Sequence, residues 1–141
     1  MAKRDNRKGA IRALVRAENI RTQKELVEHL QARGFDCTQA TVSRDIAEMG
    51  FVKSEGGFYA LPEDMALKRL MGEHALSVEE AGNLVVVKTR GGSASLLGEV
   101  VDNADIAGLV GTIAGDNTIM IAVKTEERAA EIARHLEEML K

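Results

Sequence analysis

The sequence predicts an α+β protein made of two unlike parts that join near Pro62, the only proline in 141 residues. Before this proline, apolar residues recur at helical spacing, whereas β-branched runs such as Leu84–Val87 follow it. The charge divides at the same place: residues 1–62 hold 11 Lys and Arg against 8 Asp and Glu, and residues 63–141 hold 8 against 14. We therefore expect a first domain over residues 1–62, a linker over 63–75 and a second domain over 76–141.

The composition excludes several classes of protein. No apolar run is long enough to cross a bilayer, and the amino terminus lacks the apolar stretch of a secretory signal, so we expect a cytoplasmic protein that contacts no membrane. The lone Cys37 cannot form an internal disulfide or a cysteine metal cage, and the three histidines stand in polar contexts. The sequence indicates no Ser-His-Asp or Cys-His grouping of the kind that activates a catalytic nucleophile. We expect no catalytic site, no metal and no cofactor.

Three helices are predicted in the first domain. Ile11, Leu14 and Val15 stand at i, i+3 and i+4 and give the first helix one apolar face. Thr22 and Glu25 have the spacing of a capping box, which predicts the start of the second helix. The third helix is predicted to begin at Thr38 and to end before Gly50.

The third helix has two unlike faces when it is projected at 100° per residue. Val42, Ile46 and Met49 fall within a narrow arc, which predicts that they face the core. The opposite face has small alanines around Arg44, so the helix could approach a DNA groove closely. An arginine in that place can bond the O6 and N7 atoms of guanine. The flanking polar residues suited to phosphate or base-edge hydrogen bonds are Gln39, Thr41 and Ser43.

A simpler interpretation of this face is also open. Alanine favours helices, and Arg44 could merely pair with Glu48 on a solvated surface. The segments that follow favour the DNA-binding interpretation: two short runs, Phe51–Ser54 and Phe58–Leu61, flank a turn that contains a Gly pair. Three helices and a hairpin make a winged helix-turn-helix, in which Lys53 would lie on the wing near a phosphate.

Residues 1–16 carry an excess of positive charge. Lys3, Arg4, Arg7, Lys8, Arg12 and Arg16 are opposed only by Asp5. Such cations favour contact with nucleic-acid phosphates, although any short domain can be a few charges positive.

The second domain is predicted to have the order β-α-β-β-α. Leu84–Val87 begins it, a helix with Ala94, Leu97 and Val101 on one face follows, and strands are expected over residues 108–114 and 118–123. Because Ile119–Val123 is apolar throughout, we expect both of its faces to be covered. The last helix opens at Thr125. About 75 residues bury only a modest core, so oligomerisation is expected.

Two carboxylates in the second domain are candidates for holding a ligand. Asp116 stands on the tight Gly115-Asp116-Asn117 turn, and Asp102 stands near the end of the preceding helix. Carboxylates pair best with a guanidinium, which donates in a bidentate fork. The alternative is that Gly-Asp-Asn is an ordinary hairpin turn.

Three segments together form a family pattern. They are Ile20–Gln23 with Glu25-Leu26, then Thr38–Asp45 (TQATVSRD), then Gly111–Asp116 (GTIAGD). In this order, and over nearly the whole chain, they resemble the arginine repressor family. The resemblance implies a winged-helix domain that binds a double-stranded operator, joined to a trimer-forming domain, with two trimers stacked as a hexamer. It also implies that L-arginine binds between the trimers and strengthens operator binding, so that arginine biosynthesis genes are repressed and, in some members, catabolic genes are activated.

The resemblance assigns roles by position. Ser43 and Arg44 match the family's base-contacting pair, with Gln39 in support, and Asp116 and Asp102 match its ligand carboxylates. Ser95 stands where members carry an amide near the ligand. Asn117 departs from the usual second aspartate, a change worth about 1–3 kcal/mol if that carboxylate meets a cation. Residues 91–94, Gly-Gly-Ser-Ala, also depart from the usual Pro-Gly-Asn-Ala.

Two alternatives stay open. One is a DNA-binding regulator of the same fold with another amino-acid effector, or with none, and it is motivated by Asn117. The other makes the second domain a regulatory module of an amino-acid enzyme, although no remaining segment is long enough to be catalytic.

Overall fold

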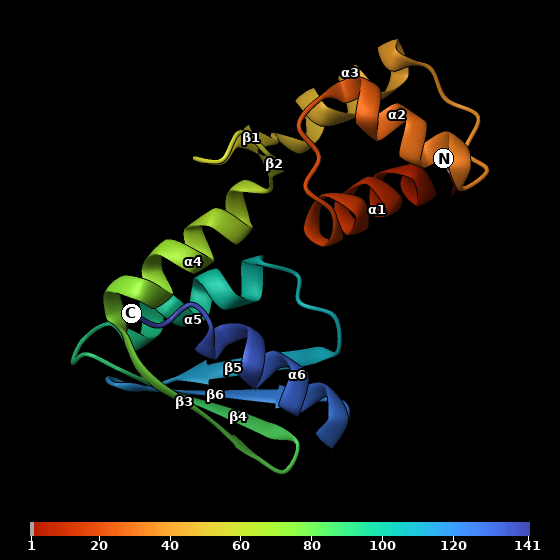
Figure 1. Cartoon of the computed structure of the whole chain (residues 1–141). Helices are drawn as coiled ribbons and strands as arrows, with labels where there is room; N and C mark the ends of the chain where they lie inside the picture. The colour runs from red at the N-terminus through yellow and green to blue at the C-terminus, as the bar shows by residue number, and fades with distance from the viewer. Residues whose placement is uncertain (1) are drawn as a thin grey trace. The chain divides into compact units, whose positions relative to one another are not determined.

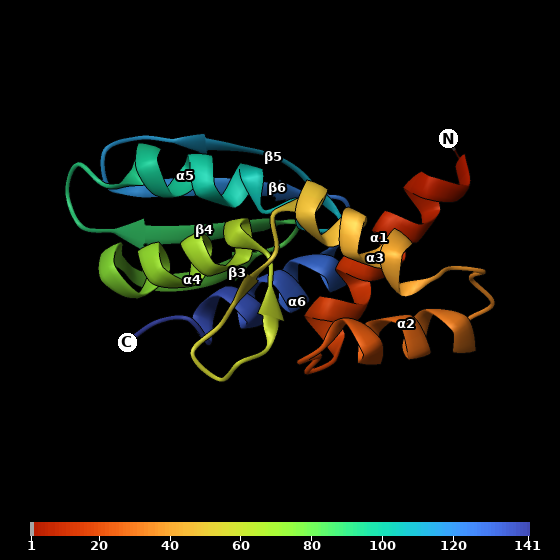
Figure 2. The ribbon, with the colours of Figure 1, turned by 90° about the horizontal axis from the view of Figure 1, so that it is seen from above.

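The structure is a computed structural model of the chain (Figures 1 and 2). Its amino-terminal part consists mainly of capped helices. The structure describes residues 2–141, with the side chains of residues 6–141. Thr22 Oγ1 accepts the backbone N–H of Glu25 at 3.1 Å, and Thr38 Oγ1 accepts that of Thr41 at 3.3 Å. The predicted helix starts are therefore confirmed. The helices are α1 (Ala2–Ala17), α2 (Gln23–Ala32) and α3 (Gln39–Met49).

The predicted capping box differs in one bond. Glu25 Oε2 accepts from the backbone N–H of Arg21 at 3.1 Å, one residue before the cap. Helix α3 ends at Gly50, which has a φ of 71° and donates its N–H to the Ile46 carbonyl. This left-handed geometry suits glycine and stops the helix where the sequence predicted.

The predicted hairpin follows as two short antiparallel strands, β1 (Val52–Lys53) and β2 (Tyr59–Ala60). The Tyr59 N–H donates to the Ile20 carbonyl at 2.8 Å, which fastens the hairpin to the residues before α2. The three helices pack on one another through fully buried side chains, which include Ile11, Leu14, Leu26, Leu30 and Val42. The three-helix-plus-hairpin order that defines a winged helix is therefore present.

The linker expected over residues 63–75 is instead mostly helix. Helix α4 (Pro62–His74) begins at the proline, whose fixed φ suits a first helical position. Its buried side chains, Leu67, Leu70 and Met71, follow helical spacing and belong to the core of the second part. The chain divides within α4 into two units, one ending at Met65 and the other Ala66–Lys141.

The second unit is a four-stranded antiparallel sheet with helices on one face. The strand order is β3-β4-β6-β5. The strands are β3 (Ala75–Ala81), β4 (Leu84–Thr89), β5 (Leu109–Ala114) and β6 (Thr118–Val123), and the helices are α5 (Ala94–Asn103) and α6 (Glu126–Glu137).

Strand β3 was not predicted. It is an edge strand that pairs only with β4, and it carries Ser77, Glu79 and Glu80 with no buried residue. The sequence signal for a strand is weak where no side chain has to be apolar. After α4, the order of the second unit is thus β-β-α-β-β-α.

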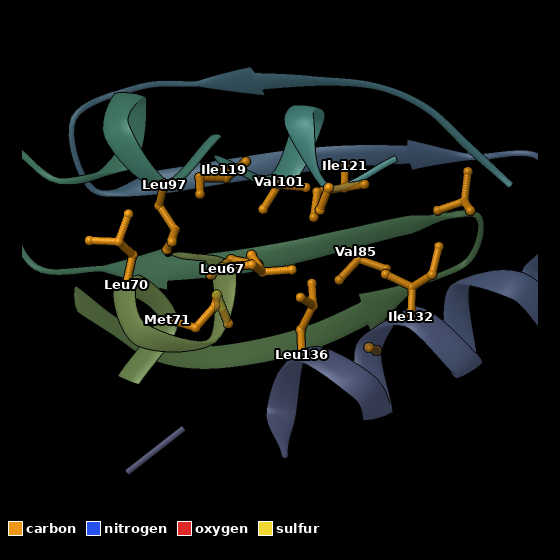
Figure 3. Close-up of a cluster of buried hydrophobic side chains, with 14 of the residues drawn as sticks. Leu67, Leu70, Met71, Val85, Leu97, Val101, Ile119, Ile121, Ile132 and Leu136 are labelled. Carbon is orange, nitrogen blue, oxygen red and sulfur yellow. The ribbon is translucent and has the colours of Figure 1, made fainter. Parts of the chain in front are cut away.

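The core of this unit lies between the sheet and the helices. Side chains of α4, α5 and α6 point toward Val85, Ile119 and Ile121 of the two central strands (Figure 3). The alternate residues of β6 face the other way, and Met120 is 43% exposed. The expectation that β6 is covered on both faces is therefore wrong within the single chain, because the helices cover only one face. No helix of the described residues is long and apolar enough to cross a membrane.

Candidate nucleic-acid interface and ligand turn

The outward face of α3 is polar and open, as the sequence predicted. Val42 and Ile46 are buried and Met49 is half-buried, whereas Gln39, Arg44 and the alanines beside it are exposed. The cap at Thr38 and the left-handed stop at Gly50 fix the two ends of this face. The face therefore presents Arg44 from a rigid element, which is what a base contact in the major groove requires.

Arg44 is not paired with a carboxylate among residues 6–141. Its Nε lies 3.5 Å from the Ala40 carbonyl of its own helix, a marginal hydrogen bond. Glu48, its expected partner on a merely solvated face, accepts instead from Lys8 Nζ at 2.6 Å. Among the described side chains, the guanidinium of Arg44 is therefore exposed and held only by that marginal bond.

The other candidate residues of α3 differ in how exposed they are and in whether their side chains are already hydrogen-bonded. Gln39 is exposed and Ser43 is half-buried. The hydroxyls of Thr41 and Thr38 are 3.0 Å apart, so the Thr41 side chain belongs to the helix cap.

Lys53 turns back onto its own domain. Its Nζ donates to the carbonyls of Arg21 and Gly57 and lies 4.0 Å from the centroid of the Tyr59 ring. This geometry holds the hairpin against the segment before α2. Arg21, which the sequence did not single out for binding, lies with its guanidinium carbon 4.2 Å from the centroid of the Phe58 ring.

The basic residues of α1 are paired within their own unit. Arg7 pairs with Asp45, Lys8 with Glu48, Arg12 with Glu63 and Arg16 with Asp64. The expectation that these four side chains contact phosphates therefore does not hold in this arrangement, because acidic residues of α3 and α4 lie beside them. Lys3, Arg4 and Asp5, which belong to the same predicted cluster, have side chains outside the described ones.

The pair between Arg7 and Asp45 is the most buried of these. Arg7 Nε donates to Asp45 Oδ2 at 2.5 Å and Nη2 donates to Oδ1 at 3.1 Å. The Asp45 side chain is 4% exposed, and the hydrogen bond to it raises the pKa of Arg7. Beside the pair is a pocket of about 250 Å³, lined by Arg7, Thr41, Arg44, Asp45 and Glu48.

The turn with Asp116 and Asn117 is held by backbone hydrogen bonds. The Asp116 carbonyl accepts from the N–H groups of Gly92 at 3.1 Å and Ala94 at 3.2 Å, and the Asn117 carbonyl accepts from Thr89 at 2.8 Å. Both side chains are exposed. The turn is thus fixed beside the start of α5 with its carboxylate pointing to solvent, a geometry that could receive a cation.

Asp102 and Ser95 lie on α5. Thr112 Oγ1 donates to both carboxylate oxygens of Asp102, at 2.9 and 3.0 Å, which ties the helix to β5. Ser95 is exposed in the first turn of the helix. Ala94, where the Asp116 turn is bound, and Asp102 are eight positions apart, which is about 12 Å along the helix. The two aspartates therefore do not meet within one chain.

Two family models match the chain in consecutive segments. "Arginine repressor, DNA binding domain" covers residues 2–66 and "Arginine repressor, C-terminal domain" covers residues 71–138. The chain belongs to the arginine repressor family. It is a DNA-binding, arginine-responsive transcriptional repressor and not an enzyme. The alternative of an enzyme's regulatory module is therefore wrong.

Individual arginine repressors are similar over most of their length. That of Halothermothrix orenii is 41% identical, over 90% of this chain and 92% of its own. That of Geobacillus sp. is 43% identical, over 92% and 94%, and that of Thermus thermophilus is 45% identical, over 92% and 85%.

Sequence reasoning missed the buried ion pair that Asp45 makes beside the outward face of α3. Asp45 follows Val42 by three residues, which places it about 60° around the helix, at the edge of the buried arc. An acidic residue at that edge needs a cation, and this was the available signal. The partner, Arg7, is 38 positions away and no local pattern indicates it. No cluster of His, Cys, Asp and Glu in the described part could hold a metal.

Proposed function

We propose that this repressor binds operator DNA as a homo-oligomer in the cytoplasm, with L-arginine as co-repressor, and represses arginine biosynthesis genes. The observation that carries the DNA side is the outward face of α3. There Arg44 lies exposed and without a carboxylate partner among residues 6–141, between small alanines.

Arg44 contacts a guanine in the major groove through its guanidinium. Ser43 and Gln39 contact phosphates or base edges beside it, and Thr41 supports the first turn. Lys53 contacts a phosphate only if its ammonium leaves the carbonyls of Arg21 and Gly57.

The Arg44→Ala variant tests this assignment. We expect the ratio of operator to random-duplex affinity to fall about tenfold or more, since a bidentate contact to guanine contributes roughly 1–3 kcal/mol of discrimination. Fluorescence anisotropy on both duplexes measures it. Arg134→Ala, which removes the same charge from the exposed face of α6, is the control and should keep the ratio. An unchanged ratio in Arg44→Ala would reject the assignment of Arg44.

On the ligand side, Asp116 and Asp102 bind the cationic groups of L-arginine, with Asn117 and Ser95 nearby. The separation of the two aspartates along α5 supports a site completed by more than one subunit. Binding there acts on DNA affinity through the assembled state, because a ligand shifts an equilibrium only by its differential affinity.

The assembly is a trimer, with two trimers forming a hexamer. Its support in this chain is the uncovered face of the sheet. Val86, Met120 and Ile113 are cross-strand neighbours there, and Ile113 is 71% exposed. A connected apolar row of this kind is typical of an interface.

A second candidate function keeps the DNA-binding domain and changes the effector. Asn117 favours it, because an amide keeps one acceptor of the aspartate but loses its charge. Calorimetric titration with arginine, ornithine, citrulline and lysine separates the two. Binding of arginine alone supports the co-repressor, whereas binding of another amino acid in its place supports the second candidate.

A further inference from the structure

A buried acidic residue stands directly beside the proposed base-contacting arginine. Asp45 follows Arg44 on α3, and its side chain is 4% exposed, whereas Arg44 is exposed. A buried carboxylate is strongly unfavourable unless a cation neutralises it with good geometry. The residue that neutralises Asp45 therefore affects the orientation of the neighbouring Arg44 side chain.

Arg7 supplies that neutralisation from another helix. Both carboxylate oxygens of Asp45 accept from its guanidinium, at 2.5 and 3.1 Å, in a fork that Lys cannot reproduce. In the described part, Asp45 accepts no side-chain hydrogen bond from any other residue. One turn further along α3, Glu48 is bonded by Lys8, the next residue of α1.

Arg44 lies within reach of the same acidic residues. The pocket beside α1 and α3 is lined by Arg7, Arg44, Asp45 and Glu48, with Thr41. If Arg7 were absent, Arg44 would be the remaining arginine among the described residues that line this pocket. A flexible, marginally bonded guanidinium would then gain by turning from the outward face toward the unpaired carboxylate.

We propose that Arg7 is a positioning residue for DNA recognition, which occupies Asp45 and so leaves Arg44 available to the operator. This inference rests on the proposed base contact of Arg44. Arg7 thus serves DNA recognition indirectly. It does not contact DNA, but its ion pair with Asp45 prevents Asp45 from pairing with Arg44, the residue that does.

Four variants of the full chain test this role by operator and random-duplex affinities. Arg7→Ala is expected to lose about tenfold in their ratio, close to the loss in Arg44→Ala. Asp45→Asn is expected to keep the ratio, because no charge is left to attract Arg44. The double variant Arg7→Ala/Asp45→Asn is expected to regain it. The control, Arg16→Ala, removes the same charge and a bidentate pair from α1, but with Asp64 instead of α3, and should keep the ratio.

The pattern separates positioning from a purely structural pair. A structural pair predicts that Arg7→Ala and Asp45→Asn lose selectivity alike and that the double variant stays low, and either result overturns the proposal. Circular dichroism checks folding at the assay temperature. If Arg7→Ala does not fold, Arg7→Gln replaces it. A low ratio in Arg7→Gln that Arg7→Gln/Asp45→Asn restores supports the proposal, and a normal ratio in Arg7→Gln overturns it.

These variants, together with Arg44→Ala, distinguish a failure of this inference from a failure of the proposed function. A normal ratio in Arg44→Ala rejects the base contact itself. A low ratio in Arg44→Ala with a normal ratio in Arg7→Ala rejects only the role of Arg7.

Discussion

Arg44 and Asp45 are neighbours in sequence but lie in opposite environments. Arg44 is exposed on the outward face of α3, and Asp45 is buried against α1. The helical projection predicted the first of these, because periodicity specifies which side of a helix faces the core. It could not predict the second, since the partner of Asp45 comes from a distant part of the chain. Long-range ion pairs depend on how helices pack.

Outside the helices, the position of a candidate residue was predicted better than the direction of its side chain. Asp116 and Asn117 lie on an exposed turn as expected. Lys53 was predicted from its position on the wing, but its ammonium bonds carbonyls of its own domain. A lysine side chain has many rotamers, so sequence places its backbone and not its charge.

The thiol of Cys37 offers a test of packing at the start of α3. Cys37 is 5% exposed, and burial raises the pKa of its thiol. Because the thiolate is the reactive form, we expect iodoacetamide to modify the native chain much more slowly at neutral pH than the urea-unfolded chain. The native rate should keep rising with pH beyond the point where the rate of a free cysteine levels off. Mass spectrometry of timed samples measures both rates, and equal rates would contradict a buried Cys37.

At the scale of elements, the sequence predicted helices best where an N-cap residue precedes apolar residues at helical spacing. The starts of α2 and α3, at Thr22 and Thr38, followed from such signals. The sequence did not predict helix α4, because a proline followed by acidic residues is typical of a linker as well as of a helix start, which Pro62 and Glu63 form here. Strand β3 was missed because it is a polar edge strand.

Two glycines give opposite predictions for the stability of the first unit. Gly9 lies in α1 with nothing within 4 Å of an added Cβ, so Gly9→Ala should raise the free energy of unfolding by about 0.5–1 kcal/mol. Gly50 has a φ of 71°, so Gly50→Ala should lower it by about 1–2 kcal/mol through backbone strain. At Gly50 the nearest atom to a Cβ is Pro62 Cγ at 4.0 Å, so the effect is not a clash. Thermal unfolding followed at 222 nm measures both, and shifts in the same direction would contradict the α1 and α3 geometries.

At the scale of the whole molecule, the uneven charge of the sequence follows the division into two units with different functions. The net positive part is the DNA-binding unit, and much of the charge on its first helix is balanced internally by Asp45, Glu48, Glu63 and Asp64. The acidic part is the sheet unit, whose outer face is the proposed contact with other copies. Joining several modest DNA-binding units raises their effective concentration, so operator binding tightens without new contacts.

The apolar row on the outer sheet face predicts how assembly can be lost. Ile113→Lys places a charge opposite Met120, and we expect sedimentation to give a single chain in place of an oligomer. The sheet itself should stay folded, since Ile113 is largely exposed within one chain. Glu137→Lys on the exposed face of α6 is the control and should leave assembly intact. An unchanged mass in Ile113→Lys would place the interface elsewhere.

The most direct test of an arginine-dependent repressor is the affinity of the full chain for a duplex from upstream of an arginine biosynthesis gene of its own genome. Fluorescence anisotropy with and without millimolar L-arginine measures it at one salt concentration, with citrulline as the neutral control. L-arginine is predicted to tighten binding to this duplex and to have little effect on a random one. Equal operator affinity with and without L-arginine would contradict the account.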